Sequence, residues 1–133
     1  MIIGVTLAKC PITNEYPLDL FLKQHLLKIN NNESLFDKLV IGYPKDDKEV
    51  EAVILDVELQ FPELLNKIYT RPLLWNANSN VAWDHEDQYL ELMTNTIGCV
   101  EGIAETNDWL IKMDLDEFLH EKNAHEIRRH INN

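Results

Sequence analysis

The sequence predicts an α/β domain built on a parallel sheet, and two observations carry this prediction. Short apolar runs rich in β-branched residues alternate, about four times, with segments whose apolar residues recur at helical spacing. Strands joined through helices form right-handed crossovers, which place parallel strands side by side with helices on both faces. The chain has 133 residues, of which 45% are hydrophobic. We therefore expect one globular domain over residues 1–133 with its own core.

The first half of the chain contains two predicted strands and two predicted helices. Ile2–Leu7 and Leu39–Tyr43 are solidly apolar, as strands covered on both faces are. One helical stripe begins after Pro17, and a second ends before Pro62. These stripes consist of Leu18, Phe21, Leu22, Leu26 and Ile29, and of Val50, Val53, Ile54 and Val57.

The second half continues the alternation. Lys67–Thr70 is a weaker strand candidate, and a long helix with an apolar face is predicted from Tyr89 to Ala104. Trp109–Met113 is a further apolar strand, and a last helix is expected to begin near Asn123. The order of elements thus remains that of an α/β domain to the end of the chain.

The charge and the cysteine content limit the partners and the cellular location that we expect. The formal net charge is −11, and an acidic surface repels phosphate backbones, so we expect no nucleic-acid partner. An anionic ligand must then be met locally, by a metal ion, a cationic side chain or backbone N–H groups. Two isolated cysteines, no signal peptide and no apolar stretch of membrane-spanning length predict a cytoplasmic location without a transmembrane segment.

Ligands of such sheets bind beyond the carboxyl ends of the strands, which selects the segments Ala8–Glu15, Pro44–Asp47 and Asp114–Phe118. In the last of these, Asp114 and Asp116 stand two residues apart and point to the same side of an extended chain. A shared divalent cation relieves their repulsion, and hard oxygen ligands favour Mg²⁺ or Mn²⁺. The alternative is a solvated acidic turn that caps the next helix.

The segment Asn107–His120, NDWLIKMDLDEFLH, resembles the DxD region of GT-A glycosyltransferases, in particular the family 2-like group. Val5–Leu7 followed by Lys9 and Asn14–Glu15 resembles the first strand and the (R/K)NE motif of that family. Phe21–His25 resembles the helix that follows. The sequence departs from the family pattern where four residues separate Lys9 from Asn14–Glu15.

The resemblance implies a Rossmann-like GT-A nucleotide-sugar-binding domain. Such a domain would transfer a sugar from a nucleoside-diphosphate sugar to a glycan, lipid or protein acceptor. Asp114 and Asp116 would bind the Mn²⁺ or Mg²⁺ that holds the diphosphate. The residues expected to line the donor are Thr6, Ala8, Lys9, Glu15, Asp46 and Asp114. The family continues well beyond the DxD strand, so we expect this chain to be the donor-binding half; its catalytic residues are not identified.

Three other interpretations stay open at this stage. Asp46, three residues before Glu49, either binds the donor or caps a helix, and Asp47 favours capping. The chain could bind nucleotide sugars, or a partner, without catalysis. IKMDLDEFL also resembles the first motif of haloacid dehalogenase-like phosphatases. That would make Asp114 a nucleophile and Asp116 a general acid.

Overall fold

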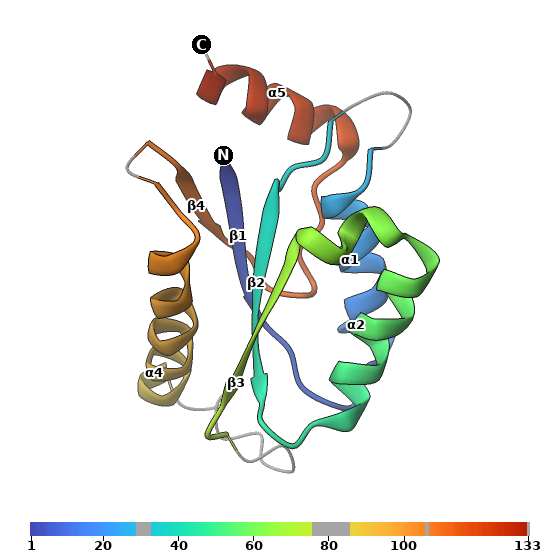
Figure 1. Ribbon diagram of the computed structural model, residues 1–133, viewed down its shortest axis with the longest axis vertical. Helices are drawn as coiled ribbons and strands as arrows, with labels where there is room; N and C mark the ends of the chain where they lie inside the picture. Colours follow the sequence, from blue (N-terminus) through green and yellow to red (C-terminus); the bar gives the residue numbers. More distant parts are fainter. Residues whose placement is uncertain (29–32, 76–85, 106, 133) are drawn as a thin grey trace.

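The computed structural model describes residues 1–28, 33–75, 86–105 and 107–132, and it shows a four-stranded sheet with helices on both faces (Figure 1). The strand order is β3-β2-β1-β4, and all strands are parallel. The elements are β1 (Ile2–Leu7), α1 (Leu18–Leu26), β2 (Lys38–Pro44), α2 (Lys48–Gln60), η1 (Pro62–Asn66), β3 (Ile68–Leu73), α4 (Glu86–Ile97), η2 (Gly98–Gly102), β4 (Trp109–Lys112) and α5 (Glu121–Asn132). The predicted α/β class is therefore confirmed, and the topology is Rossmann-like.

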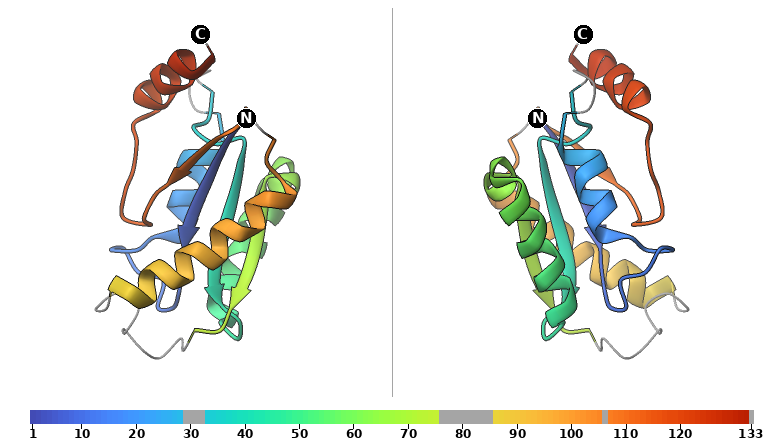
Figure 2. Two further views of the ribbon diagram at one scale, coloured as in Figure 1. Left: turned by 90° about the vertical axis from the view of Figure 1, so that its left-hand side faces the viewer. Right: turned by 90° about the vertical axis from the view of Figure 1, so that its right-hand side faces the viewer.

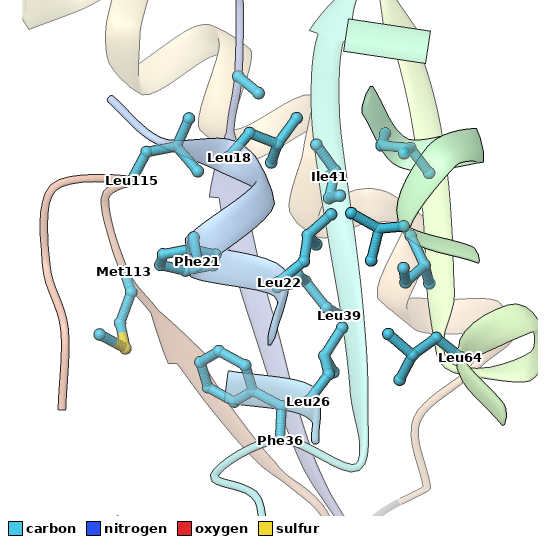
Figure 3. Packing of buried hydrophobic residues seen from close by; sticks show 14 of the residues in the cluster. Leu18, Phe21, Leu22, Leu26, Phe36, Leu39, Ile41, Leu64, Met113 and Leu115 are labelled. Carbon is cyan, nitrogen blue, oxygen red and sulfur yellow. The ribbon is translucent and has the colours of Figure 1, made fainter. Parts of the chain in front are cut away.

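The two faces of the sheet carry separate cores. Helices α1 and α2 cover one face and α4 covers the other (Figure 2). On the α1 side, Phe21, Leu22 and Leu26 pack against Leu39 and Ile41 of β2 (Figure 3). The stripe predicted for this helix is confirmed up to Leu26, and its last member lies outside the described residues.

Two strand glycines allow close packing on opposite faces. A Cβ on Gly4 would lie 2.6 Å from the Phe36 ring, on the α1 side. A Cβ on Gly42 would collide with the Thr96 hydroxyl of α4 and would lie 2.9 Å from Leu7. The absence of a side chain at these positions lets an aromatic ring and a helix approach the sheet directly.

Several predicted boundaries are corrected by the structure. β3 runs to Leu73, beyond the predicted Thr70, because an edge strand accommodates the exposed Arg71 and Pro72. The predicted long helix is α4 followed by the 3₁₀ turn η2, which begins and ends at glycines that disfavour α-helix. The last helix begins at Glu121, before the predicted Asn123.

β4 departs from the expectation that every strand is covered on both faces. It is the outermost strand on its side of the described sheet, with Trp109 54% and Leu110 43% exposed. It pairs with β1, so Ile2 lies opposite Trp109. The apolar sequence of β4 therefore does not reflect complete burial within the described residues.

Helix α5 lies across the amino-terminal ends of the strands and is anchored there by one arginine (Figure 1). The buried Arg128 donates to the carbonyl oxygens of Ser34 and Leu35, at 3.0 and 2.9 Å. It also donates to both carboxylate oxygens of Asp37, at 3.1 Å. These hydrogen bonds compensate for the loss of water around the buried guanidinium charge of Arg128.

Candidate functional site

The strand order creates a switch point between β1 and β4. From β1 the chain proceeds to β2 and β3 on one side, and it returns to β4 on the other side. In open parallel sheets the ligand crevice lies outside the carboxyl ends of the strands at such a point. Here β1 leads into the loop Ala8–Pro17, and β4 leads into Met113 and Asp114. The predicted acidic motif thus follows one of the two strands that flank the switch point.

Asp114 forms two side-chain contacts at the end of β4. Its Oδ1 accepts a hydrogen bond from the Tyr89 hydroxyl at 2.8 Å and lies 3.2 Å from the Lys112 Nζ. Lys112 also lies over the Tyr89 ring, with Nζ 5.0 Å from the centroid. The side chain of Asp114 remains 47% exposed. A carboxylate held this way is oriented by its neighbours and still accessible to a ligand.

The protonation states of the two neighbours suit these contacts. Burial raises the pKa of the Tyr89 phenol above its ordinary value of 10.0, so it remains a hydrogen-bond donor at neutral pH. Hydrogen bonding to Tyr89 is the largest cause that raises the pKa of Lys112, so this side chain remains a cation. Sequence reasoning placed Tyr89 only on an apolar helix face; its polar tip was the available signal.

The chain turns directly after Asp114, and we call Asp114–Glu117 the acidic turn. The Glu117 N–H donates to the Asp114 carbonyl oxygen at 3.0 Å, and the Asp114 N–H donates to Glu117 Oε1 at 2.7 Å. Burial alternates along this segment: Met113 and Leu115 are buried beside α1, whereas Asp116 is exposed (Figure 3). The apolar residues fix the segment to the core and leave the carboxylates at the surface.

Asp47 is a structural residue. It is 3% exposed, and its carboxylate accepts from the Val50 N–H at 3.1 Å as the N-cap of α2. It also accepts from the Cys10 N–H at 2.7 Å, which ties the loop after β1 to the end of β2. The prediction that Asp47 caps α2 is confirmed. Asp46, the other candidate, is not the N-cap of this helix.

A pocket of about 570 Å³ lies beyond the ends of β2 and β3, next to the loop after β1. Its lining includes the exposed Asp46, together with Cys10, Leu73 and Trp75. Burial, and secondarily the Asp47 carboxylate, raise the pKa of the Cys10 thiol above its ordinary value of 9.0. The thiol is therefore protonated at neutral pH and is a poor nucleophile.

The remaining predicted donor residues are distributed differently. Thr6 and Ala8 are fully buried, and Lys9 is 8% exposed. Thr6 lies in the β1 ladder opposite Ile41 and is not among the residues that line the pocket. Glu15 is exposed on the loop before α1, outside the described lining of the pocket. Of the predicted residues, the structure places Asp46 at the pocket and Asp114 and Asp116 on the acidic turn.

A divalent cation at the acidic turn would need ligands beyond the carboxylates of the turn itself. Within the described residues, no group of three or more His, Cys, Asp or Glu side chains is arranged to hold a metal ion. Mg²⁺ commonly binds through one or two carboxylates together with waters and substrate phosphates. Asp114 and Asp116 offer that donor set at the surface.

Comparisons of the chain with protein-family models, with curated proteins and with solved structures find no match. In the described part of the chain, the helices are too short or too polar to cross a bilayer.

Proposed function

We propose that this domain binds a nucleoside-diphosphate sugar through a divalent cation and serves as the donor-binding part of a GT-A, family 2-like glycosyltransferase. The observation that carries this proposal is the acidic turn, which exposes Asp114 and Asp116 at the carboxyl end of β4, next to the switch point of the sheet. Exposed carboxylates at that place favour a site for a metal-bound phosphate ligand over the alternative of a solvated surface turn.

Each part of the proposed site has a chemical task. Asp114 and Asp116 would hold Mn²⁺ or Mg²⁺. When bound, such an ion offsets the charge of the diphosphate and of the leaving group. This also explains how a protein of net charge −11 attracts an anionic donor. We assign the strand-end pocket beside Asp46 to the base and ribose, because it is partly apolar and adjoins the loop after β1.

Titration calorimetry with uridine and guanosine diphosphates, each with and without Mn²⁺, tests the proposal. We expect binding that requires Mn²⁺ and that Asp116→Ala abolishes. Glu63→Ala is the matched control, because it removes an exposed carboxylate from η1, which precedes β3 and so lies away from the carboxyl ends of the strands. Binding that is equally strong without the metal, or unchanged in Asp116→Ala, would contradict the proposed site.

Transfer and binding without transfer are separated by a second measurement. A glycosyltransferase donor site hydrolyses its donor slowly in a metal-dependent reaction, whereas a binding domain does not. Release of free sugar from a uridine-diphosphate sugar, measured with and without Mn²⁺, therefore distinguishes the two. No specific observation favours the phosphatase interpretation, in which Asp114 would attack phosphate; its carboxylate is instead paired with Lys112 and Tyr89.

A further inference from the structure

The last turn of α1 contacts the segment that follows the acidic turn. Gln24 Nε2 donates to the Leu119 carbonyl oxygen at 2.9 Å, and the Leu119 N–H donates to His25 Nε2 at 3.3 Å. Two adjacent side chains of one helix therefore hold both backbone polar groups of Leu119, a residue more than ninety positions away in sequence. We call Gln24 and His25 the clamp.

The contacts of His25 determine its tautomer. Its Nδ1 lies 3.1 Å from the Phe21 carbonyl oxygen, which can only accept, so Nδ1 carries the proton. The Leu119 N–H can only donate, so Nε2 is the unprotonated acceptor. The fully buried ring is thus neutral and uses both nitrogens. Burial accordingly lowers the pKa of His25 to about 4.

Aromatic contacts add to the clamp on the same segment. The His25 ring stacks on Phe118, with centroids 5.6 Å apart and an interplanar angle of 29°. Phe21 contacts both rings edge-on, at 4.4 Å from His25 and 6.1 Å from Phe118. Phe118 is nevertheless 43% exposed, so it is held by one side of its ring.

These contacts place Asp116 between two anchors. Leu115, immediately before it, is buried in the core beside α1. Phe118 and Leu119, shortly after it, are held by the clamp. A leucine at position 25 would fill this apolar environment without a buried polar group. The histidine instead supplies the acceptor for the Leu119 N–H, two residues after the acidic turn.

We infer that Gln24 and His25 are positioning residues, which hold the acidic turn in the arrangement that meets the metal and the diphosphate. This inference rests on the proposed function for its ligand. Neither residue contacts the ligand directly; both act through the backbone of Leu119. The clamp restricts the freedom of a surface turn whose carboxylates would otherwise have to be ordered on binding.

Three substitutions test the clamp. His25→Phe keeps a ring that can stack but removes the acceptor for the Leu119 N–H. His25→Gln restores an acceptor oxygen near the position of Nε2. Gln24→Met keeps the length of the side chain and removes the donor to Leu119. Gln60→Met is the control, because the Gln60 amide donates a solvent-exposed hydrogen bond to Asp56 of the same helix, α2.

Two readouts are measured on each variant of the 133-residue chain. Amide hydrogen exchange at residues 114–119 is compared with exchange in β1, which reports global opening. Calorimetry measures the affinity for uridine diphosphate in the presence of Mn²⁺. For His25→Phe and Gln24→Met, we expect exchange at residues 114–119 to rise about five- to tenfold relative to β1, and affinity to fall by about the same factor. His25→Gln should recover most of both losses, and Gln60→Met should match the wild type.

The outcomes separate this inference from the function on which it rests. Unchanged relative exchange at residues 114–119 in both His25→Phe and Gln24→Met overturns the clamp. Faster exchange with unchanged affinity overturns the positioning role. If the wild type binds no uridine diphosphate with Mn²⁺, the proposed function fails, and with it the role toward that ligand. The exchange data then still decide whether the clamp orders the acidic turn.

Discussion

Two aspartates follow two strands of the same sheet, and the structure uses them differently. Asp47, after β2, is 3% exposed and accepts two backbone N–H groups, from Cys10 and Val50. Asp114, after β4, has a side chain that is 47% exposed, and its carboxylate contacts two side chains, Lys112 and Tyr89. Both stand where ligands of parallel sheets bind.

The difference shows how to separate structural carboxylates from candidate ligands at a strand end. A carboxylate saturated by backbone donors belongs to the fold, because any ligand would have to break buried hydrogen bonds. A carboxylate whose partners are side chains at the edge of the core can exchange them for a cation. Asp47 is therefore expected to affect stability, and Asp114 to affect binding.

Replacement of Asp47 should have the largest effect on stability. Asp47→Ala removes the α2 cap and leaves the Cys10 N–H without its acceptor, which should lower the free energy of unfolding by about 3 kcal/mol. Asp47→Ser should lose about half as much, because serine retains the cap. Urea unfolding measures both, with the exposed neighbour Asp46→Ala as control. A loss under about 1 kcal/mol for Asp47→Ala would contradict the structural role of Asp47.

Acid should lower the free energy of unfolding, because His25, which holds Leu119 after the acidic turn, resists protonation in the folded protein. The pKa of His25 is lowered from 6.5 to about 4 in the folded protein, so on acidification the unfolded chain takes up the proton first. The stability that neutral His25 contributes is full above pH 6.5 and is lost as the pH falls toward 4. We expect a loss of about 2 kcal/mol between pH 7 and pH 5.

Urea unfolding at the two pH values checks this prediction against His25→Gln, which cannot titrate. The difference in stability between pH 7 and pH 5 should be smaller in the variant by about the same 2 kcal/mol. Identical pH dependence in both proteins would show that His25 does not resist protonation in the folded state.

Asp114→Asn should change stability by less than about 1 kcal/mol, because exposed ion pairs contribute little. The same substitution should weaken Mn²⁺-dependent binding of uridine diphosphate at least about tenfold, since it removes a charged ligand. Urea unfolding and calorimetry on one preparation provide both values. A variant that unfolds readily but binds normally would reverse the roles assigned to the two aspartates.

Replacement of Lys112 should have the smallest effect, and it tests whether Asp114 is accessible to a cation. Its ammonium competes with a cation for Asp114 Oδ1, so Lys112→Met should raise the affinity for Mn²⁺ alone about threefold. Lys48→Met is the control, because Lys48 is an exposed cation on α2 that pairs with Glu51. A weaker affinity in Lys112→Met would mean that the lysine supports the metal site and does not compete with it.

The sequence predicted the central part of the fold well. β1 agrees residue for residue with the predicted Ile2–Leu7, and β2 extends the predicted Leu39–Tyr43 by one residue at each end. Both strands are buried on two faces, so their apolar runs are continuous and unambiguous. Edge strands obey weaker rules, which explains why the end of β3 was missed and the exposure of Trp109 was not foreseen.

The site was predicted only as far as local pattern reaches. Asp114 and Asp116 stand out because they follow an apolar strand. Their partners do not, since Tyr89 lies 25 residues from Asp114 and His25 lies 94 residues from Leu119. Hydrogen bonds between distant elements depend on how the elements pack, and no spacing rule within one element describes that. The same holds for Arg128, which on sequence is an ordinary helix cation and in the fold is buried.

The position of β1 at the centre of the sheet has a consequence for the chain during its synthesis. Ile2–Val5 pair with Trp109–Lys112, so one edge of β1 has no partner until roughly 100 further residues have been made. At ordinary translation rates of about 5–20 residues per second, that edge waits roughly 5–20 s. For this interval the nascent polypeptide presents an unpaired apolar strand, the kind of surface that molecular chaperones shield from aggregation.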